Sequence, residues 1–373
     1  MITVRRRSRI TIAAVAAALF LCVAPSAEAA GKRLVGVNGV PAPNAVGMAR
    51  LAAGGTDTIR ISVGWRQIEP LPGFRDWVHL DSVVAGATGA GMEVLPVLTH
   101  SPKWVSGNNP AAPPIYSGTA RAAWSAFITD LVARYGTNGT FWAAHPELPR
   151  RPFRYYQVWN EVNLRAFWGG RPNPRGYAEL VGLTSRALSA DPDAKLLLAG
   201  LIPYRTASAG SVDGTTYLKR LLKFRALRRH VDAVAVHPYG RVPRVVIKGI
   251  ERIREVLSPT RTKKPGKRIR RPRWVRKLPI FVTEFGWATG GELWNISPVR
   301  ADPGEQARWV KRSYKLMRKN AKRLRLRRAL YFNVQDFDAE GTDYWSARMG
   351  LFDLAGNPKP AWFAYVRRAG GTP

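Results

Sequence analysis

The chain has 373 residues, of which 46% are hydrophobic and 23% charged, a composition typical of a globular protein with a large core rather than of a disordered chain. Its formal net charge is +34, and its one cysteine, Cys22, lies close to the N-terminus, so the remainder of the chain supplies neither a disulfide nor thiol chemistry. The few histidines are dispersed, and we find no metal-ligand spacing and no glycine-rich phosphate loop, so the sequence predicts no metal and no cofactor.

Residues 1–30 have the features of a secretory signal peptide. Four arginines precede an apolar run from Ile10 to Val23, and Ala27-Glu28-Ala29 offers small residues for cleavage. A membrane anchor is the alternative, but the run is shorter than the ~20 residues that a membrane span needs. We therefore expect a secreted domain over residues 31–373, with no membrane span once the leader is removed.

After the leader, apolar strand-like runs alternate with amphipathic helix-like segments. The predicted strands are 34–38, 58–63, 94–98, 155–159, 195–200, 233–237, 279–283 and 329–333. The predicted helices are 80–89, 119–135, one that begins at Asn173-Pro174, one that begins at the capping pair Asp302 and Glu305, and 361–367. This alternation favours a parallel β/α architecture, although periodicity does not distinguish a closed barrel from an open doubly wound sheet.

Two of the predicted strands end in a glutamate. The first reads Val158-Trp159-Asn160-Glu161-Val162-Asn163, and the second reads Thr283-Glu284-Phe285-Gly286-Trp287. A single glutamate at a strand end is more often a surface residue or part of a salt bridge. Two carboxyl groups brought to one face of a β/α fold are, however, what a retaining glycosidase requires, at a separation of about 5 Å.

These two stretches, in this order, resemble those of the large clan of (β/α)8 glycoside hydrolases. The first stretch, followed by Phe167-Trp168, is most similar to family 39 and its cellulase-like relatives. The resemblance covers most of the chain after residue 33. It implies an α/β fold of the TIM-barrel type with a single domain, Glu161 as the acid/base at the end of strand 4, and Glu284 as the nucleophile at the end of strand 7.

The resemblance also implies roles for polar residues near the other strand ends. Asn160 would bind the sugar hydroxyl beside the anomeric carbon. Arg60, in strand 2, would keep the nucleophile ionised, with a structural ion pair as the alternative. His237 and Tyr239, after strand 6, would orient the nucleophile, with a buried core histidine as the alternative for His237. His100, at the end of strand 3, is a further candidate for substrate binding.

Tryptophans in the loops after the strands are candidates for the floor of a glycan cleft, because sugars present flat apolar faces. These candidates are Trp65, Trp104, Trp168, Trp287 and Trp345. We expect about half of them to touch substrate and the others to belong to the core. The clan commonly places a tryptophan at the end of strand 8; here the strand continues as Asn333-Val334-Gln335, and we expect Trp345 to take that place.

Two stretches concentrate the positive charge, one at 263–273 and one along the predicted helix before strand 8, between Lys311 and Arg323. In a barrel both lie away from the catalytic face, which predicts docking to an anionic cell-surface polymer; a solvated arginine-rich surface is the alternative. Nucleic acid is not an expected partner, because the chain has no recognition motif and no aromatics interleaved with these charges.

The sequence favours a secreted retaining O-glycosyl hydrolase that acts on a carbohydrate substrate. One alternative is a non-catalytic barrel that binds anionic cell-wall polymers through its basic surface, although a binding protein has no need of both glutamates. The other is a transglycosidase, which would use every residue named above.

Overall fold

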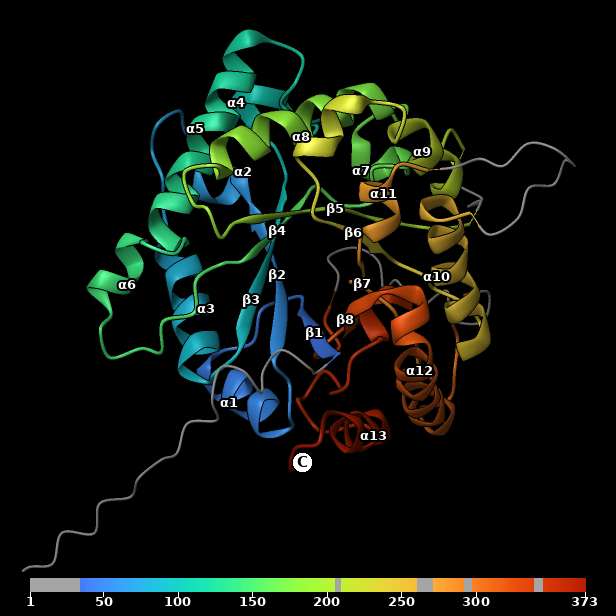
Figure 1. The fold of residues 1–373 in the computed structure, drawn as a ribbon. Helices are drawn as coiled ribbons and strands as arrows, with labels where there is room; N and C mark the ends of the chain where they lie inside the picture. The colour runs from blue at the N-terminus through green and yellow to red at the C-terminus, as the bar shows by residue number, and fades with distance from the viewer. Residues whose placement is uncertain (1–33, 205–208, 260–270, 292–296, 339–344) are drawn as a thin grey trace, which may run out of the picture. The chain divides into compact units, whose positions relative to one another are not determined.

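Eight parallel strands close into a barrel in which each strand pairs with the next along the chain and the last pairs with the first (Figure 1). This computed structural model describes residues 34–204, 209–259, 271–291, 297–338 and 345–373. The strands are β1 (Val35–Gly39), β2 (Thr58–Gly64), β3 (Glu93–Thr99), β4 (Tyr155–Val158), β5 (Lys195–Leu201), β6 (Ala233–Val236), β7 (Ile280–Val282) and β8 (Leu326–Tyr331). The predicted (β/α)8 barrel is confirmed, whereas the predicted leader at 1–30 lies outside the described residues.

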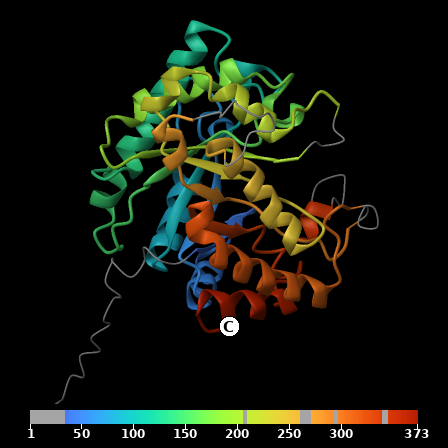
Figure 2. The same cartoon turned by 45° about the vertical axis from the view of Figure 1, so that its right-hand side comes forward.

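Helices surround the barrel, and Figure 2 shows α12 and α13 side by side beneath α10. The helices are α1 (Ala45–Ala53), α2 (Trp65–Ile68), α3 (Val78–Gly89), α4 (Lys103–Ser106), α5 (Gly118–Tyr135), α6 (Thr140–Ala144), α7 (Arg165–Trp168), α8 (Pro174–Leu188), α9 (Gly214–Leu221), α10 (Pro243–Leu257), α11 (Arg273–Lys277), α12 (Pro303–Leu324) and α13 (Pro360–Ala369), with 3-10 turns η2 (Arg225–Arg229) and η4 (Trp345–Arg348). Among the described residues, none of these helices combines the length and the apolar character needed to cross a membrane.

The predicted strands all occur, with shifted ends. β8 begins at Leu326 rather than at residue 329, because Arg327 and Arg328 are part of the strand. The side chain of Arg328 donates a hydrogen bond to Glu93 at the start of β3, at 2.9 Å. This partner allows a charged residue in a strand whose predicted range was based on apolar residues alone. The five predicted helices are also confirmed, whereas α1, α9 and α10 are among the helices that we did not predict.

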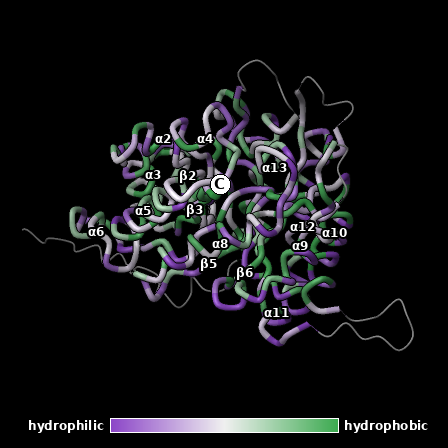
Figure 3. Tube along the Cα trace, turned by 90° about the horizontal axis from the view of Figure 1, so that it is seen from above, coloured by the Kyte–Doolittle hydropathy of each residue, from purple (hydrophilic) through white to green (hydrophobic). Residues whose placement is uncertain are grey.

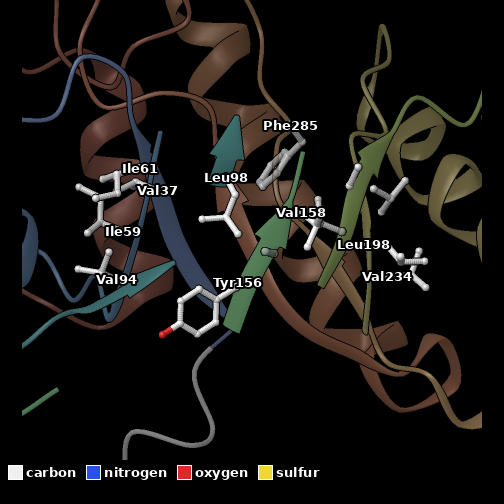
Figure 4. Close-up of a cluster of buried hydrophobic side chains, with 14 of the residues drawn as sticks. Val37, Ile59, Ile61, Val94, Leu98, Tyr156, Val158, Leu198, Val234 and Phe285 are labelled. Atoms are coloured by element: carbon white, nitrogen blue, oxygen red, sulfur yellow. The ribbon is translucent and has the colours of Figure 1, made fainter. Parts of the chain in front are cut away.

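The strands divide the core into two parts because successive side chains point to opposite faces of the sheet. Ile59 and Ile61 of β2 pack outward with helix residues, as do the residues of the other strands labelled in Figure 4. A smaller cluster made only of strand residues fills the inside of the barrel. Its members are Leu95, Leu197, Ala233, Ala235, Phe281 and Leu330.

Polar residues replace apolar ones on this inner face toward the C-terminal ends of the strands. Arg60 lies between Ile59 and Ile61 and points inward, beside Asn38 of β1. Gln157 follows two residues after Tyr155, and His237 two residues after Ala235, so both continue an inward-facing row. All four side chains are buried, which places a polar cluster at the mouth of an otherwise apolar barrel.

The N-terminus of α12 has the capping pair that the sequence predicted. The carboxylate of Asp302 accepts a hydrogen bond from the Glu305 backbone N–H at 2.7 Å, and the Glu305 carboxylate accepts one from the Asp302 N–H at 3.2 Å. Two backbone donors that a helix leaves without intrahelical partners are satisfied in this way.

We expect Asp302→Ala to lower the free energy of unfolding by about 1 kcal/mol, because the first turn of α12 loses its cap. Asp302→Asn is the matched control, since an asparagine side chain also accepts a hydrogen bond from the backbone. Denaturant midpoints of the three proteins provide the measurement. An alanine variant as stable as the wild type would show that this cap does not contribute to folding.

Candidate active site

A strained turn after β4 directs Glu161 into the mouth of the barrel. Trp159 and Glu161 have φ angles of 65° and 42°, which non-glycine residues rarely adopt and which cost about 1–3 kcal/mol each. Two contacts hold the turn: the Trp159 indole donates a hydrogen bond to the Phe167 carbonyl at 2.7 Å, and the Glu161 carboxylate meets the His237 ring at 2.7 Å. Tertiary contacts on both sides of the turn therefore hold the backbone in this strained conformation.

Glu161 and Glu284 face each other across this mouth. A carboxylate oxygen of each, together with a ring nitrogen of His237, lies within 4.8 Å of the others. Their side chains are only 8% and 10% exposed. The separation matches the spacing of about 5 Å that a double displacement requires, so the predicted proximity of the two glutamates is confirmed, while their catalytic roles remain predictions.

The guanidinium of Arg60 is the centre of the polar cluster. It lies 2.7 Å from the Glu284 carboxylate and donates further hydrogen bonds to Asn38 at 2.5 Å, Gln157 at 3.0 Å and Asn160 at 2.9 Å. Its side chain is only 6% exposed. A buried cation is costly unless it is paired and fully hydrogen-bonded, and four acceptors meet that need here. The structure thus places Arg60 where the resemblance predicted it, against Glu284.

Asn38 and Gln157 are site residues that sequence reasoning missed. The amide of Asn38 donates to the Thr283 carbonyl at 2.8 Å, which connects β1 to the residue before Glu284. Gln157 donates to the Oδ1 atom of Asn160 at 3.3 Å while accepting from Arg60. The available signal was a polar residue inside each otherwise apolar strand. Because side chains alternate between the two faces of a strand, their positions would have shown that both point inward.

The surroundings of Glu284 stabilise its ionised form. Burial by itself would raise the pKa of Glu284, but the electrostatic effect of His237 and the charge of Arg60, together with hydrogen bonds from Tyr239 and Arg60, outweigh burial and hold this pKa below its ordinary value. Tyr239 donates its hydroxyl to Glu284 at 2.8 Å. Burial and the two neighbouring carboxylates raise the pKa of Tyr239, so its hydroxyl stays protonated and remains a donor.

The surroundings of Glu161 have the opposite effect. Burial raises its pKa, and the negative charge of Glu284 adds to the rise, while the hydrogen bond and charge of His237 oppose it only in part. The site therefore separates two identical side chains into one that favours the protonated form and one that favours the ionised form, the pattern by which paired carboxylates acquire different roles.

His237 lies between the two glutamates rather than beside one of them. Its Nδ1 atom is 2.7 Å from Glu161, and its Nε2 atom is 2.9 Å from the Thr283 hydroxyl and 3.4 Å from Glu284. The prediction that His237 orients the nucleophile is thus incomplete, because its shorter contact is with Glu161. Gly200 of β5 makes room for the ring: a Cβ atom there would lie 2.0 Å from Nε2, so no other residue fits.

Glu161, His237 and Glu284 are also the one grouping of three donor side chains within the described residues that could hold a metal ion. The guanidinium of Arg60, in contact with Glu284, already supplies the positive charge at this place. A cation bound by the three donors would be repelled by it.

Three of the five candidate tryptophans are core residues, in line with the expectation that only about half would touch substrate, and these three are removed as substrate-binding candidates. Trp65, Trp168 and Trp287 have at most 1% of their surface exposed. Trp65 and Trp287 donate their indole N–H groups to Glu69 and to the Gly240 carbonyl, and each packs edge-on against other rings. Their loops do follow the strands, but the rings point into the layer between barrel and helices, where no sugar reaches them.

Other aromatic residues remain accessible. Trp104 is half-buried beside Trp65, as a cleft residue could be. Phe167 and Tyr116 are 41% and 68% exposed. Both belong to segments that touch each other after β3 and β4, since Asn109 donates to the Gly169 carbonyl at 2.8 Å.

The aromatic at the end of β8 is Phe332, which sequence reasoning passed over. Its ring is half-buried and lies edge-on to Tyr239, with ring centroids 6.5 Å apart. It follows β8 directly and so occupies the position for which we proposed Trp345 as a substitute, whose side chain lies outside the described residues. His100 is exposed at the end of β3, and its ring contacts the Thr99 hydroxyl at 3.1 Å.

The opposite pKa shifts predict opposite pH dependences of stability for two matched variants. Glu161 contributes stability that is present below its unfolded-state pKa and lost as the pH rises through its raised folded-state pKa. Glu161→Gln should therefore gain stability relative to the wild type as the pH rises above about 4. Glu284 contributes stability above its unfolded-state pKa that is lost as the pH falls through its lowered folded-state pKa, so Glu284→Gln should be less stable at neutral pH and approach the wild type in acid.

Melting temperatures between pH 3 and pH 8 measure both differences, each unit of pKa shift being worth about 1.4 kcal/mol. If the melting temperatures of both variants, relative to the wild type, changed with pH in the same direction, the two carboxyl groups would have the same charge state.

No protein-family model matches the chain, and no curated protein matches it in sequence. Solved structures with the same fold include a family 39 glycoside hydrolase from Bacteroides cellulosilyticus, with a TM-score of 0.66, 18% identity and 91% of this chain covered. A β-xylosidase from Caulobacter crescentus has a TM-score of 0.59, 20% identity and 90% coverage. An exo-β-1,4-mannosidase from an Opitutaceae bacterium has a TM-score of 0.59, 15% identity and 90% coverage.

This chain spans 64%, 67% and 59% of the lengths of those three structures, respectively. Their identities are too low to carry more than the architecture. The comparison therefore establishes that the chain has the (β/α)8 barrel fold that these glycoside hydrolases share.

Proposed function

We propose that this protein is a secreted O-glycosyl hydrolase that cleaves its substrate with retention of anomeric configuration. The observation that carries the proposal is the pair of buried carboxyl groups, within 4.8 Å of each other, whose pKa values are shifted in opposite directions. Barrels of the same fold include a β-xylosidase and an exo-β-1,4-mannosidase, which supports a carbohydrate substrate.

In the first step, the ionised carboxylate of Glu284 attacks the anomeric carbon. The bond from that carbon to the leaving oxygen breaks, and Glu161 transfers its proton to this oxygen. The sugar is then held as an ester on Glu284. In the second step, Glu161, now a carboxylate, takes a proton from a water molecule, which attacks the same carbon and releases Glu284.

The hydrogen bonds around the pair prepare it for this sequence. Arg60 and Tyr239 hold Glu284 by one oxygen each, which orients the carboxylate before substrate enters. Since Oδ1 of Asn160 accepts hydrogen bonds from Arg60 and Gln157, its Nδ2 group is the end of the amide that would donate to the sugar hydroxyl beside the reacting carbon. Groups fixed in advance need little reorganisation in the transition state.

The experiment that tests this proposal is a screen of aryl glycosides and polysaccharides with the wild type, Glu161→Ala and Glu284→Ala. We expect both variants to lose at least about 10²–10⁴-fold in kcat, because each removes a group that acts in the transition state. Azide should restore turnover of activated aryl glycosides, with opposite anomers in the two products, since it replaces water in one variant and the nucleophile in the other. If the first sugar released by the wild type has the inverted configuration by NMR, double displacement is excluded.

The pH dependence of kcat/KM should be bell-shaped, with its acidic limb set by Glu284 and its basic limb by Glu161. Arg60 lowers the pKa of both carboxyl groups. Arg60→Gln should therefore move both limbs to higher pH, whereas Arg60→Lys, which keeps the charge, should move them less.

Arg66→Gln removes an exposed arginine just after β2 and is the control for the loss of a surface charge. Limbs that stay in place in Arg60→Gln would show that this arginine does not set the charge state of the pair.

A further inference from the structure

Residues from the described ends of both basic segments line one pocket at the end of the barrel opposite the glutamates, while 263–270 lie outside the described residues. The pocket has a volume of about 400 Å³, and seven of its eight lining residues are arginine or lysine, the eighth being Ser258. Arg273, Arg276 and Lys277 come from α11, which directly follows the basic stretch at 263–273. Lys322 and Arg323 come from the last turn of α12. Segments about 50 residues apart in the chain thus contribute to one concave surface.

Hydrogen bonds of the buried Arg254 fix the position of this pocket. Its guanidinium donates to the carbonyls of Leu278 at 2.7 Å and of Leu324 at 3.1 Å. These two residues precede the starts of β7 and β8, whereas Glu284 follows the end of β7. The pocket therefore lies at the N-terminal ends of the strands, and α11 lies at the edge of the molecule in Figure 3.

Helix ends explain only part of this charge. α10, α11 and α12 all end here, and the carbonyl end of a helix attracts cations with roughly half a negative charge. Three such ends fall well short of balancing seven positive side chains. Glu251 pairs with Arg323 at 2.5 Å, and none of the lining residues is acidic. Burial, with the charge of Arg325 added, lowers the pKa of Arg254 to about 10.

We propose that this pocket binds an anionic glycopolymer, a glycan chain that carries carboxylate or phosphate groups, and so anchors the protein while the barrel mouth stays open. Guanidinium groups suit both kinds of oxyanion, since their N–H donors match two oxygens at once. The choice of a glycan over other polyanions rests on the proposed function.

Two other classes of polyanion fit the pocket less well. A single-stranded nucleic acid needs aromatic rings on which bases stack, and none lines the pocket. A lipid surface is bound by cations beside exposed apolar side chains. The large exposed apolar residues among those described, such as Val46, Phe74 and Phe363, are not among the lining residues.

The test compares two triple variants with the same loss of charge. Arg276→Glu/Lys277→Glu/Lys322→Glu changes the pocket, and Lys219→Glu/Lys223→Glu/Arg228→Glu changes exposed cations at the end of α9 and in η2. Both sets replace two lysines and one arginine, and both place a glutamate in the last turn of a helix. Binding to polygalacturonate and to a phosphomannan is measured against salt concentration, with dextran as the neutral polymer and single-stranded DNA as the competing polyanion.

We expect the pocket variant to lose about tenfold or more in affinity for at least one of the two anionic polymers. The slope of log K against log salt concentration should also become shallower by about one unit for each contact removed. The surface variant should lose much less. Equal losses in both variants, no loss in either, or a larger loss for DNA than for the glycopolymers would each overturn the proposal.

Two further measurements separate folding and catalysis from binding. A glutamine version of the pocket variant and thermal melts of every protein show whether a loss of binding reflects unfolding. Turnover of a small aryl glycoside should be the same in the pocket variant and the wild type, because the pocket lies at the other end of the strands. Polymer binding is read without hydrolysis, so a protein that cleaves no glycoside can still confirm or refute the pocket.

Discussion

The ion pair between Arg60 and Glu284 is the interaction on which the rest of the site depends. Both groups are almost completely removed from solvent, 2.7 Å apart, in a place where either alone would be strongly destabilising. Each therefore requires the other, and Arg60 also requires its neutral acceptors Asn38, Gln157 and Asn160. Together the five residues come from β1, β2, β4 and β7 or the positions just after them, so closure of the barrel is itself a condition for the charge state of Glu284.

The same interaction gives the two glutamates different pKa values. Glu284 faces the guanidinium and the Tyr239 hydroxyl, while Glu161 shares the imidazole of His237 and is otherwise buried. His237 can occupy its place only because residue 200 is a glycine. The difference between the two carboxyl groups thus arises from their neighbours on other strands and not from the groups themselves, as expected where burial and charge partners set pKa values.

Apolar periodicity and capping residues, which are local signals, predicted the eight strands and five of the helices. The resemblance carried by two motifs predicted the barrel and the convergence of both glutamates. Gln157 and Gly200 were missed because their importance depends on which residue lies opposite them across the sheet. Which of the tryptophans belong to the core was not predictable for a related reason: a loop position says that Trp65 or Trp287 follows a strand, but the direction of the ring depends on the packing of α5 and α12 behind it. The basic segments were visible in the sequence, whereas the fold was needed to show that Arg273, Lys322 and Arg323 line the same pocket.

The roles of the two glutamates are tested most directly by mass spectrometry. The protein is first allowed to react with the 2-deoxy-2-fluoro derivative of a glycoside that it cleaves. The fluorine slows both steps, because each has an oxocarbenium-like transition state. With an activated leaving group such as dinitrophenolate or fluoride the first step stays fast enough, so the sugar ester accumulates on the nucleophile. Peptide mapping should find one added sugar, on Glu284, and none in the Glu284→Gln variant. A label on Glu161, or turnover of the parent glycoside without any covalent adduct, would contradict the assignment of Glu284 as the nucleophile.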